Sequence, residues 1–276
     1  EFGTKHVRDF KTTLTPDGEG TWRLNGDKFY CTGSLFADYL AVLSHRDVDG
    51  PLVVAWVPVD AEGVERVDDW DAVGQRTTGS GTVRLRDVAV TDEWITGFSE
   101  TFEAPTTYGA FAQVMHAAFD AGIARRALDD AAEFVTTKSR PYPDSAIVYG
   151  VEKAAQDPLI VQAFGELELS VRSAEALIAV AGRAIDTADA DLTDGTAGEA
   201  SLAVAAARAA TAKVSVEVTS RIFELLGTRS ALASTNLDRH WRNARTHTLH
   251  DPAAWKVHHL GRWAVDGTLP PRHGQL

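Results

Sequence analysis

Short runs of alternating apolar and polar residues fill the first third of the chain. Alternation places every second side chain on one face, which is typical of half-buried strands. The runs are residues 21–24, 28–32, 39–44, 52–59 and 83–90. Turn signals separate them, and the strongest is Asn25-Gly26, which favours a two-residue hairpin. The pattern predicts an antiparallel β barrel or sandwich domain over residues 1–102.

From residue 104 onward, apolar positions recur at helical spacing. Start and stop signals predict helices over residues 106–138, from Asp157-Pro158 to about residue 188, from Thr196 to Gly227, from Thr235, and from Pro252. Small residues nearly fill positions 203–212, which favours close approach of neighbouring helices. Long helices with short connections predict a helix bundle over residues 103–276, so the expected fold class is α+β.

Composition narrows the functional classes. The 276 residues carry a formal net charge of −12, which argues against a nucleic-acid partner because phosphate binding needs a basic face. No apolar run is long enough to predict a membrane span. Cys31 is the one cysteine, so we expect no disulfide framework and a cytoplasmic location. Residues 1–5 read like the interior of a longer protein.

The most distinctive segment, residues 241–256, holds two histidines at a predicted helix junction. Asp251 is expected to cap the last helix, with Pro252 at its first position, so the preceding helix should end near His250. His247 and His250 then share one face of that helix's last turn. Imidazoles titrate near neutral pH, and this pair therefore suits proton transfer. The alternative is a capped, solvated corner with incidental histidines.

Other chemistries gain little support from the motifs. The chain has no Gly-x-Gly-x-x-Gly motif, no P-loop and no nucleophile elbow. A zinc site would draw on residues that are close in sequence, namely His247, His250, Asp251, His258 and His259. Pro252 interrupts the helix that would have to hold these ligands at fixed spacing, so we expect no metal site.

Two arginines follow predicted helix ends. Arg140 comes after the first long helix, and Arg229 comes after the Gly227 stop of the third. A guanidinium in such a place can bind a phosphate through two parallel hydrogen bonds. The alternative is an exposed arginine that interacts with a helix C-terminus.

The order of the two domains, together with two motifs, resembles the acyl-CoA dehydrogenase superfamily. Residues 24–33 look like the family's strand motif, where an aromatic and a hydroxyl residue meet the flavin ring, and residues 74–81 resemble its second β-domain motif. Arg140 matches the family's flavin-phosphate arginine. The resemblance covers nearly the whole chain. It implies that the family's N-terminal helical domain would precede this chain, with the motif at Gly3-Thr4 continuing upstream.

The end of the chain is similar to one branch of this superfamily. Acyl-CoA dehydrogenases place a catalytic glutamate and a glycine where this chain has Asp251-Pro252, and paired glycines where it has residues 227–230. Residues 241–252 instead resemble the dibenzothiophene monooxygenase and sulfur-acquisition branch. That resemblance implies a two-component flavin-dependent monooxygenase. Such an enzyme uses O2 and reduced FMN, supplied by a separate flavin reductase, to oxygenate a small organosulfur substrate.

The same resemblance implies roles for individual residues. His247 and His250 match the branch's active-site histidines, and Cys31 is interpreted as structural. The implied cofactor contacts are Tyr30 at the aromatic position, Thr32 near flavin N5, Trp70 beside the ring, and Arg140 and Arg229 on the phosphate side. A homotetramer assembled through the long helices is also implied. The small residues at 203–212 supply a physical reason for it, because they favour close approach of helices.

Two alternatives stay open from the sequence. In the first, the protein is an acyl-CoA dehydrogenase-type flavoprotein that holds FAD and oxidises a thioester, with Asp251 as the base. Aspartate is one methylene shorter than glutamate, and the expected capping role of Asp251 competes with catalysis. In the second, the chain is a non-catalytic oligomeric scaffold.

Overall fold

The structure is a computed structural model that describes residues 11–275. The motif expected at Gly3-Thr4 lies outside the described residues. The chain divides into two compact units. One ends at Ala72 and resumes over Arg76–Ala104, and the other comprises Val73–Gln75 and the chain from Pro105 onward. No helix within residues 11–275 is long and apolar enough to cross a membrane.

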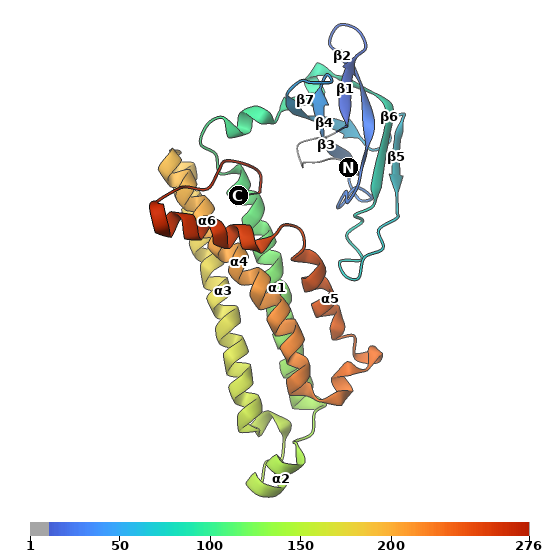
Figure 1. Cartoon of the computed structure of the whole chain (residues 1–276). Coiled ribbons are helices and arrows are strands. Elements are labelled where there is room, and N and C mark those ends of the chain that lie inside the picture. Colours follow the sequence, from blue (N-terminus) through green and yellow to red (C-terminus); the bar gives the residue numbers. More distant parts are fainter. Residues whose placement is uncertain (1–10, 276) are drawn as a thin grey trace. The chain divides into compact units, whose positions relative to one another are not determined.

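The first unit is a curled sheet whose strands follow the order β5-β6-β2-β1-β3-β4-β7 (Figure 1). In chain order its elements are β1 Thr13–Pro16, β2 Thr21–Lys28, β3 Tyr39–Arg46, β4 Leu52–Pro58, β5 Val64–Val67, β6 Thr82–Thr91, η1 Asp92–Trp94, β7 Ile95–Gly97 and η2 Ser99–Phe102. Leu24, Leu85 and Val88 are fully buried and fill the core that alternation predicts. The predicted β domain is confirmed. The sheet is mixed, however, because β1 pairs with β3 in parallel.

The hairpin prediction at Asn25-Gly26 is wrong. Strand β2 runs through both residues, and its register with β6 shifts between Leu24 and Gly26, which marks a β-bulge. The Asn25 side chain donates to Asp87 Oδ1 and accepts from Asp87 N, each at 2.9 Å. A Cβ on Gly26 would lie 2.2 Å from the hydroxyl oxygen of Thr12, so only glycine fits. An Asn-Gly pair serves a bulge as well as a turn, because both need unusual backbone angles.

The predicted strand at residues 28–32 is also wrong. Strand β2 ends at Lys28, and Tyr30 lies in the left-handed region with φ 59°. The strands β1, β5 and β7 were not predicted. Each has three or four residues, which is too short to give a clear alternating pattern.

The second unit is the predicted bundle of long helices (Figure 1). Its elements are α1 Tyr108–Thr137, α2 Pro143–Tyr149, η3 Ala154–Gln156, α3 Pro158–Ala190, α4 Asp194–Leu226, η4 Thr228–Ala231, η5 Ala233–Thr235, α5 Asp238–His247 and α6 Ala253–Asp266. Helices α1, α3 and α4 pack against one another, α5 packs on α1 and α4, and α6 packs on α4. Ala205 and Ala207 of α4 are at most 1% exposed, so the small residues at 203–212 allow close packing inside the unit.

Local sequence explains where the long helices begin and end. The Asp157 carboxylate accepts from Leu159 N at 2.9 Å and caps α3 as predicted. Helix α4 is capped by Thr193, whose hydroxyl accepts from Thr196 N at 3.1 Å. The predicted start at Thr196 is therefore wrong, because Thr196 is the inner partner of that capping box. Gly227 ends α4 with φ +73°, as predicted.

Candidate active site

A stripe of polar residues interrupts the buried, alanine-rich face of α1. Gln113, His116 and Asp120 are spaced three and four residues apart, so they lie on the same side of the helix. Gln113 and Asp120 are buried, and His116 is partly exposed. Buried polar groups need hydrogen-bond partners, and these come from α4, α5 and the turn that leads into α6.

Arg208 of α4 is the central cation of this network. Its side chain is 2% exposed, and Nη1 donates to Asp120 Oδ2 at 2.5 Å. Nη2 donates to Asp251 Oδ1 at 3.1 Å, and Nε donates to Gln113 Oε1 at 3.3 Å. A guanidinium stays charged in a protein, so it balances the two buried carboxylates as anions. The guanidinium therefore ties α4 to α1 and to the turn before α6.

His247, the last residue of α5, binds the other oxygen of Asp120. Its Nδ1 lies 2.7 Å from Asp120 Oδ1, and its Nε2 lies 3.1 Å from Nδ1 of His116. The rings of Phe119 and His247 meet edge to face, with 5.6 Å between centroids. A carboxylate only accepts hydrogen bonds, so the proton of the first bond sits on Nδ1 of His247. His247 is thus held in one tautomer.

His250 forms a second histidine–carboxylate pair. Its Nδ1 lies 3.2 Å from Asp251 Oδ1, and its side chain is half exposed. The ring of His250 lies against that of His116, with 4.0 Å between centroids and 32° between planes. Helix α5 ends at His247, earlier than expected, and His250 follows in a turn. The two predicted histidines are nevertheless brought together, because both contact His116.

Asp251 does not cap α6, so the predicted capping role is wrong. Pro252 is the N-cap residue, and α6 has no side-chain cap at its start. The buried Asp251 carboxylate instead pairs with Arg208 and with Lys256, whose Nζ lies 3.0 Å from Oδ2. Burial alone would raise the pKa of Asp251. The hydrogen bond from His250 and the charges of Lys256 and Arg208 outweigh burial and hold that pKa well below its usual range.

His116 stands between the two histidine–carboxylate pairs. Burial, followed by the charges of His250, His247 and Arg208, lowers the pKa of His116 to about 4. The imidazole is therefore neutral near pH 7, and the network contains one neutral histidine that contacts two others. This arrangement is suited to holding and passing protons.

Five members of the network were not predicted from the sequence: Gln113, His116, Asp120, Arg208 and Lys256. One signal was present on α1, where three polar residues at helical spacing interrupt a run of small residues. A second was the single arginine within the small residues at 203–212. A charge in such a run is rarely left unpaired, so it predicts a buried partner.

The zinc ligands considered from the sequence do not come together as one set in the described residues. Among residues 11–275, no three histidine, cysteine, aspartate or glutamate side chains converge as metal ligands would. His258 and His259 lie on α6 beside Trp255, with ring centroids 5.1 and 6.2 Å from the indole. Within the described residues, the guanidinium of Arg208 bonds to two carboxylates and an amide.

In the first unit, the structure places Tyr30, Thr32 and Trp70 close together. The rings of Tyr30 and Trp70 meet edge to face, with 6.0 Å between centroids, and Tyr30 is exposed. The hydroxyl oxygen of Thr32 lies 2.8 Å from that of Ser80, which lies 2.6 Å from that of Thr78. This part of the first unit therefore combines aromatic surface with a chain of hydroxyl groups.

Asp69 and Cys31 are neighbours of these residues in the sequence. The Asp69 carboxylate, next to Trp70, accepts from both N and Oγ1 of Thr82, at 2.8 and 2.7 Å. These bonds fix the loop on β6, and the side-chain bond from Thr82 lowers the pKa of Asp69. Burial raises the pKa of the Cys31 thiol, which disfavours the reactive thiolate and agrees with a structural role.

Arg140 and Arg229 occur at the same end of the helical unit. Arg229 Nη1 donates to the carbonyl oxygen of Lys138 at 2.9 Å, just past the end of α1. Arg140 follows two residues later and is exposed. Thr137, which ends α1, is separated from His116 by 21 helical residues, so this end lies about 32 Å from the histidines. The contact of Arg229 with Lys138 is the helix-end interaction considered as the alternative role.

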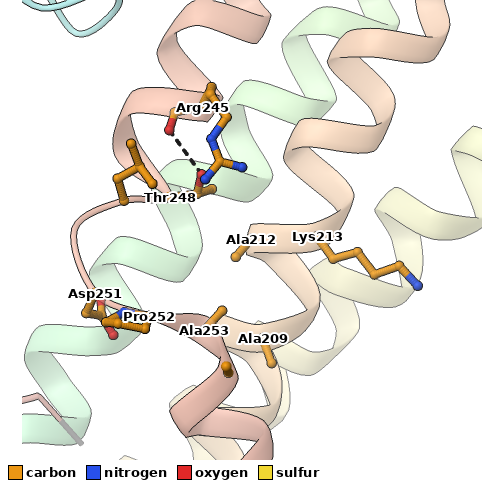
Figure 2. A pocket seen from close by; sticks show the side chains of 10 residues that line it. Ala209, Ala212, Lys213, Arg245, Thr248, Asp251, Pro252 and Ala253 are labelled. Atoms are coloured by element: carbon orange, nitrogen blue, oxygen red, sulfur yellow. Dashed lines mark hydrogen bonds between the residues drawn. The ribbon is translucent and has the colours of Figure 1, made fainter.

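A pocket of about 420 Å³ lies between α4 and the turn from α5 into α6 (Figure 2). Arg245, Lys213 and Asp251 are its charged lining residues, and alanines of α4 and α6 form much of the remainder. In Figure 2 the Lys213 side chain extends away from Asp251 and Pro252. Of the described residues that line this pocket, none is a histidine. The pocket therefore touches the network only through Asp251.

Comparison with protein-family models accounts for most of the chain. Residues 3–88 match the acyl-CoA dehydrogenase middle domain, and residues 114–254 match the acyl-CoA dehydrogenase C-terminal domain. The chain belongs to the acyl-CoA dehydrogenase family. The resemblance inferred from the motifs is confirmed, including its branch.

Three relatives of this acyl-CoA dehydrogenase family member come from bacteria. Dibenzothiophene monooxygenase of Mycolicibacterium goodii is 34% identical over 96% of this chain and 66% of the relative. The probable FMNH2-dependent monooxygenase SfnC of Pseudomonas putida is 31% identical over 94% of this chain and 66% of the relative. FMN-bound TdsC from Paenibacillus sp. A11-2 superposes with a TM-score of 0.93 at 33% identity, covering 99% of this chain and 71% of TdsC. The chain thus spans 66% of the length of these curated relatives.

Proposed function

We propose that this protein is a two-component, FMN-dependent monooxygenase that oxygenates a small organosulfur compound. One observation favours the monooxygenase hypothesis over the acyl-CoA dehydrogenase hypothesis. The family resemblance places Asp251 where the dehydrogenases have their base, yet its carboxylate is buried and paired with Arg208, Lys256 and His250. A carboxylate held this way, with a lowered pKa, is a poor base for removing a proton from carbon. The relatives named as monooxygenases support the same choice.

The residues present fit a flavin mononucleotide. The first unit offers aromatic surface at Tyr30 and Trp70 and a hydroxyl group at Thr32, which suit a flat, hydrogen-bonding ring. In the second unit, Arg140 and Arg229 supply guanidinium groups for one phosphate. When bound, reduced FMN supplies the electrons that activate O2. FMN-bound TdsC and the FMNH2-dependent name of SfnC support FMN over FAD.

In this proposal His250 and His247 manage the proton. His250 is half exposed, its Nδ1 is directed to Asp251, and its Nε2 is available to hold or release a proton. His247 is enclosed and fixed by Asp120. The exposed ring suits contact with reactants, whereas the enclosed ring suits storage of charge beside a carboxylate.

A second copy of the chain completes the proposed site. The arginines and the histidines of one chain are about 32 Å apart along α1, which is too far for one FMN to span. A flavin whose ring lies near the histidines therefore takes its phosphate arginines from another copy. Exposed Leu159 and Leu169 on α3 give an apolar surface for assembly, and we propose a homotetramer. A separate reductase supplies the reduced flavin, and the single, half-buried Cys31 supports a cytoplasmic location.

A comparison of histidine variants tests this function. Full-length protein is given reduced FMN, O2 and a panel of organosulfur compounds that includes dibenzothiophene, and both oxygenated product and hydrogen peroxide are measured. His250→Ala should lower product formation by about 10²–10⁴ while peroxide rises, because loss of an acid–base group costs that much. His258→Ala, which changes an exposed histidine of α6, is the matched control and should keep wild-type yield. Reduction of bound flavin by an acyl-CoA would instead support the dehydrogenase hypothesis.

A further inference from the structure

His116 joins the two histidine–carboxylate pairs through different contacts. It shares a hydrogen bond with His247, Nδ1 to Nε2, at 3.1 Å, and its ring packs against that of His250 with 4.0 Å between centroids and 32° between planes. None of the residues assigned from the family motifs lies on α1, so the proposed function gives this histidine no role. Because His116 contacts both His247 and His250, its role depends on which ring nitrogens of these histidines carry protons.

The hydrogen bonds determine the proton positions from the buried end outward. Asp120 is an acceptor, so His247 carries a proton on Nδ1. When His247 is neutral, its Nε2 has a lone pair and accepts, and His116 must donate from Nδ1. The remaining nitrogen of His116, Nε2, then has a lone pair. The same reasoning places a proton on Nδ1 of His250, which faces Asp251.

We propose that His116 is a positioning residue that completes an Asp120–His247–His116 proton relay, in which an incoming proton is stored on His247. The inference rests on the proposed function for its catalytic meaning, but the relay itself is defined by hydrogen bonds that need no flavin. His116 acts on the chemistry through its two neighbours. It donates a hydrogen bond to Nε2 of His247, and its ring packs against that of His250.

The proton transfer balances without any other reactant. A proton binds the lone pair on Nε2 of His116, and the proton on Nδ1 of His116 passes to Nε2 of His247. His247 becomes an imidazolium with both nitrogens protonated, and its Nδ1 proton stays directed at the Asp120 carboxylate. His116 is again neutral, now with its proton on Nε2. The reverse transfer returns the proton.

The charges around the relay favour storage on His247. Asp120 lies 2.7 Å from His247, whereas a charge on His116 would face the ring of His250 at 4.0 Å without a directly bonded carboxylate. The other charged groups are Arg208 on α4, Asp251 in the turn and Lys256 on α6. Burial and the neighbouring charges lower the pKa of His116 to about 4, in agreement with a ring that passes a proton without keeping it.

Two substitutions separate the contacts of His116. His116→Asn keeps an N–H donor near the position of Nδ1 but has no second nitrogen to receive a proton. His116→Phe keeps a flat ring against His250 but has no donor for His247. If the role of His116 is purely structural, the variant that packs better should behave like the wild type. If His116 relays protons, both variants should interrupt the relay.

Solid-state NMR of ¹⁵N-histidine-labelled full-length protein, without flavin, tests the relay. At pH 7 the wild type should show His247 protonated on Nδ1 and His116 protonated on Nδ1 only, with His116 still neutral at pH 5. His116→Asn should keep the His247 tautomer, and His116→Phe should disturb its Nε2 shift. A cationic His116 at pH 6, or an unprotonated Nδ1 on His247, would overturn the relay.

Steady-state kinetics then test whether the relay contributes to oxygenation. Both variants should lower kcat for oxygenation at least about tenfold with little change in KM for reduced FMN, and should shift the pH profile of kcat. Wild-type kcat and pH profile in His116→Asn would overturn the positioning role. If the wild type oxygenates no organosulfur compound, the proposed function fails, whereas the NMR result still decides the relay.

Discussion

The guanidinium of Arg208 lies 2.5 Å from the carboxylate of Asp120, and neither side chain is more than 2% exposed. The same guanidinium reaches Asp251 at 3.1 Å. Asp120 holds His247 and Asp251 holds His250, so one buried cation sets the position of both candidate histidines. The bundle therefore supports the site through charge as well as through packing.

Replacing Arg208 by methionine should destabilise the protein strongly. Arg208→Met leaves two buried carboxylates without their shared cation, and removal of one partner from a buried ion pair typically costs about 3–5 kcal/mol. Urea unfolding, followed by circular dichroism, measures the change in the free energy of unfolding. A loss below about 1 kcal/mol would show that the buried network does not support the fold.

The matched control is Arg221→Met on the same helix. Arg221 pairs with Glu166 at 3.0 Å, but both side chains are substantially exposed. Exposed ion pairs contribute about 0–1 kcal/mol, so this variant should unfold nearly as the wild type does.

Stability should fall between about pH 6.5 and pH 4, and part of the loss should come from His116. Its pKa is about 4 in the folded protein and about 6.5 in an unfolded chain. As the pH falls through this window, the unfolded state binds the proton first, so folding is increasingly disfavoured. The loss has an upper bound of about 3 kcal/mol, reduced because the side chain is partly exposed.

Urea titrations at several pH values check this contribution. His116→Phe removes the titrating group and keeps a ring, so stability should depend less on pH between 6.5 and 4 than it does in the wild type. The same pH dependence in both proteins would mean that His116 titrates alike in the folded and unfolded states.

The sequence predicts the two units and the pair His247 and His250, because periodicity and short motifs are local. It misses His116 and Asp120, since their partners lie 131 and 127 positions away and depend on how α1 and α5 are aligned. It also misassigns Asp251. Aspartate before proline is a good cap in isolation, but two buried cations in the folded protein bind the carboxylate instead.

Arg229→Ala should weaken FMN binding about 10- to 150-fold. A hydrogen bond between charged groups contributes about 1.5–3 kcal/mol, and each 1.4 kcal/mol is a factor of ten. Quenching of flavin fluorescence measures the affinity. Thermal unfolding should be run alongside, because Arg229 also donates to the Lys138 carbonyl. Arg172→Ala, on exposed α3 surface, is the control. Equal affinity in the mutant and the wild type would remove Arg229 from the flavin site.

Leu169→Glu should disrupt the proposed tetramer. Leu169 is an exposed leucine on α3, and burying a carboxylate in an apolar interface is unfavourable. Light scattering at micromolar concentration should show a tetramer for the wild type and smaller species for the variant. Val265→Glu, which changes an exposed residue of α6, should leave the assembly intact. A monomeric wild type would count against the proposal.

A monooxygenase of the proposed kind transfers an oxygen atom from O2 to an organosulfur substrate. Full-length protein is incubated with reduced FMN, the compound panel and ¹⁸O2, and the products are analysed by mass spectrometry. The proposed function predicts a sulfur-oxygenated product that contains ¹⁸O, formed by the wild type and nearly lost in His250→Ala. Product oxygen that comes only from water, or no oxygenated product while an acyl-CoA is oxidised, would contradict it.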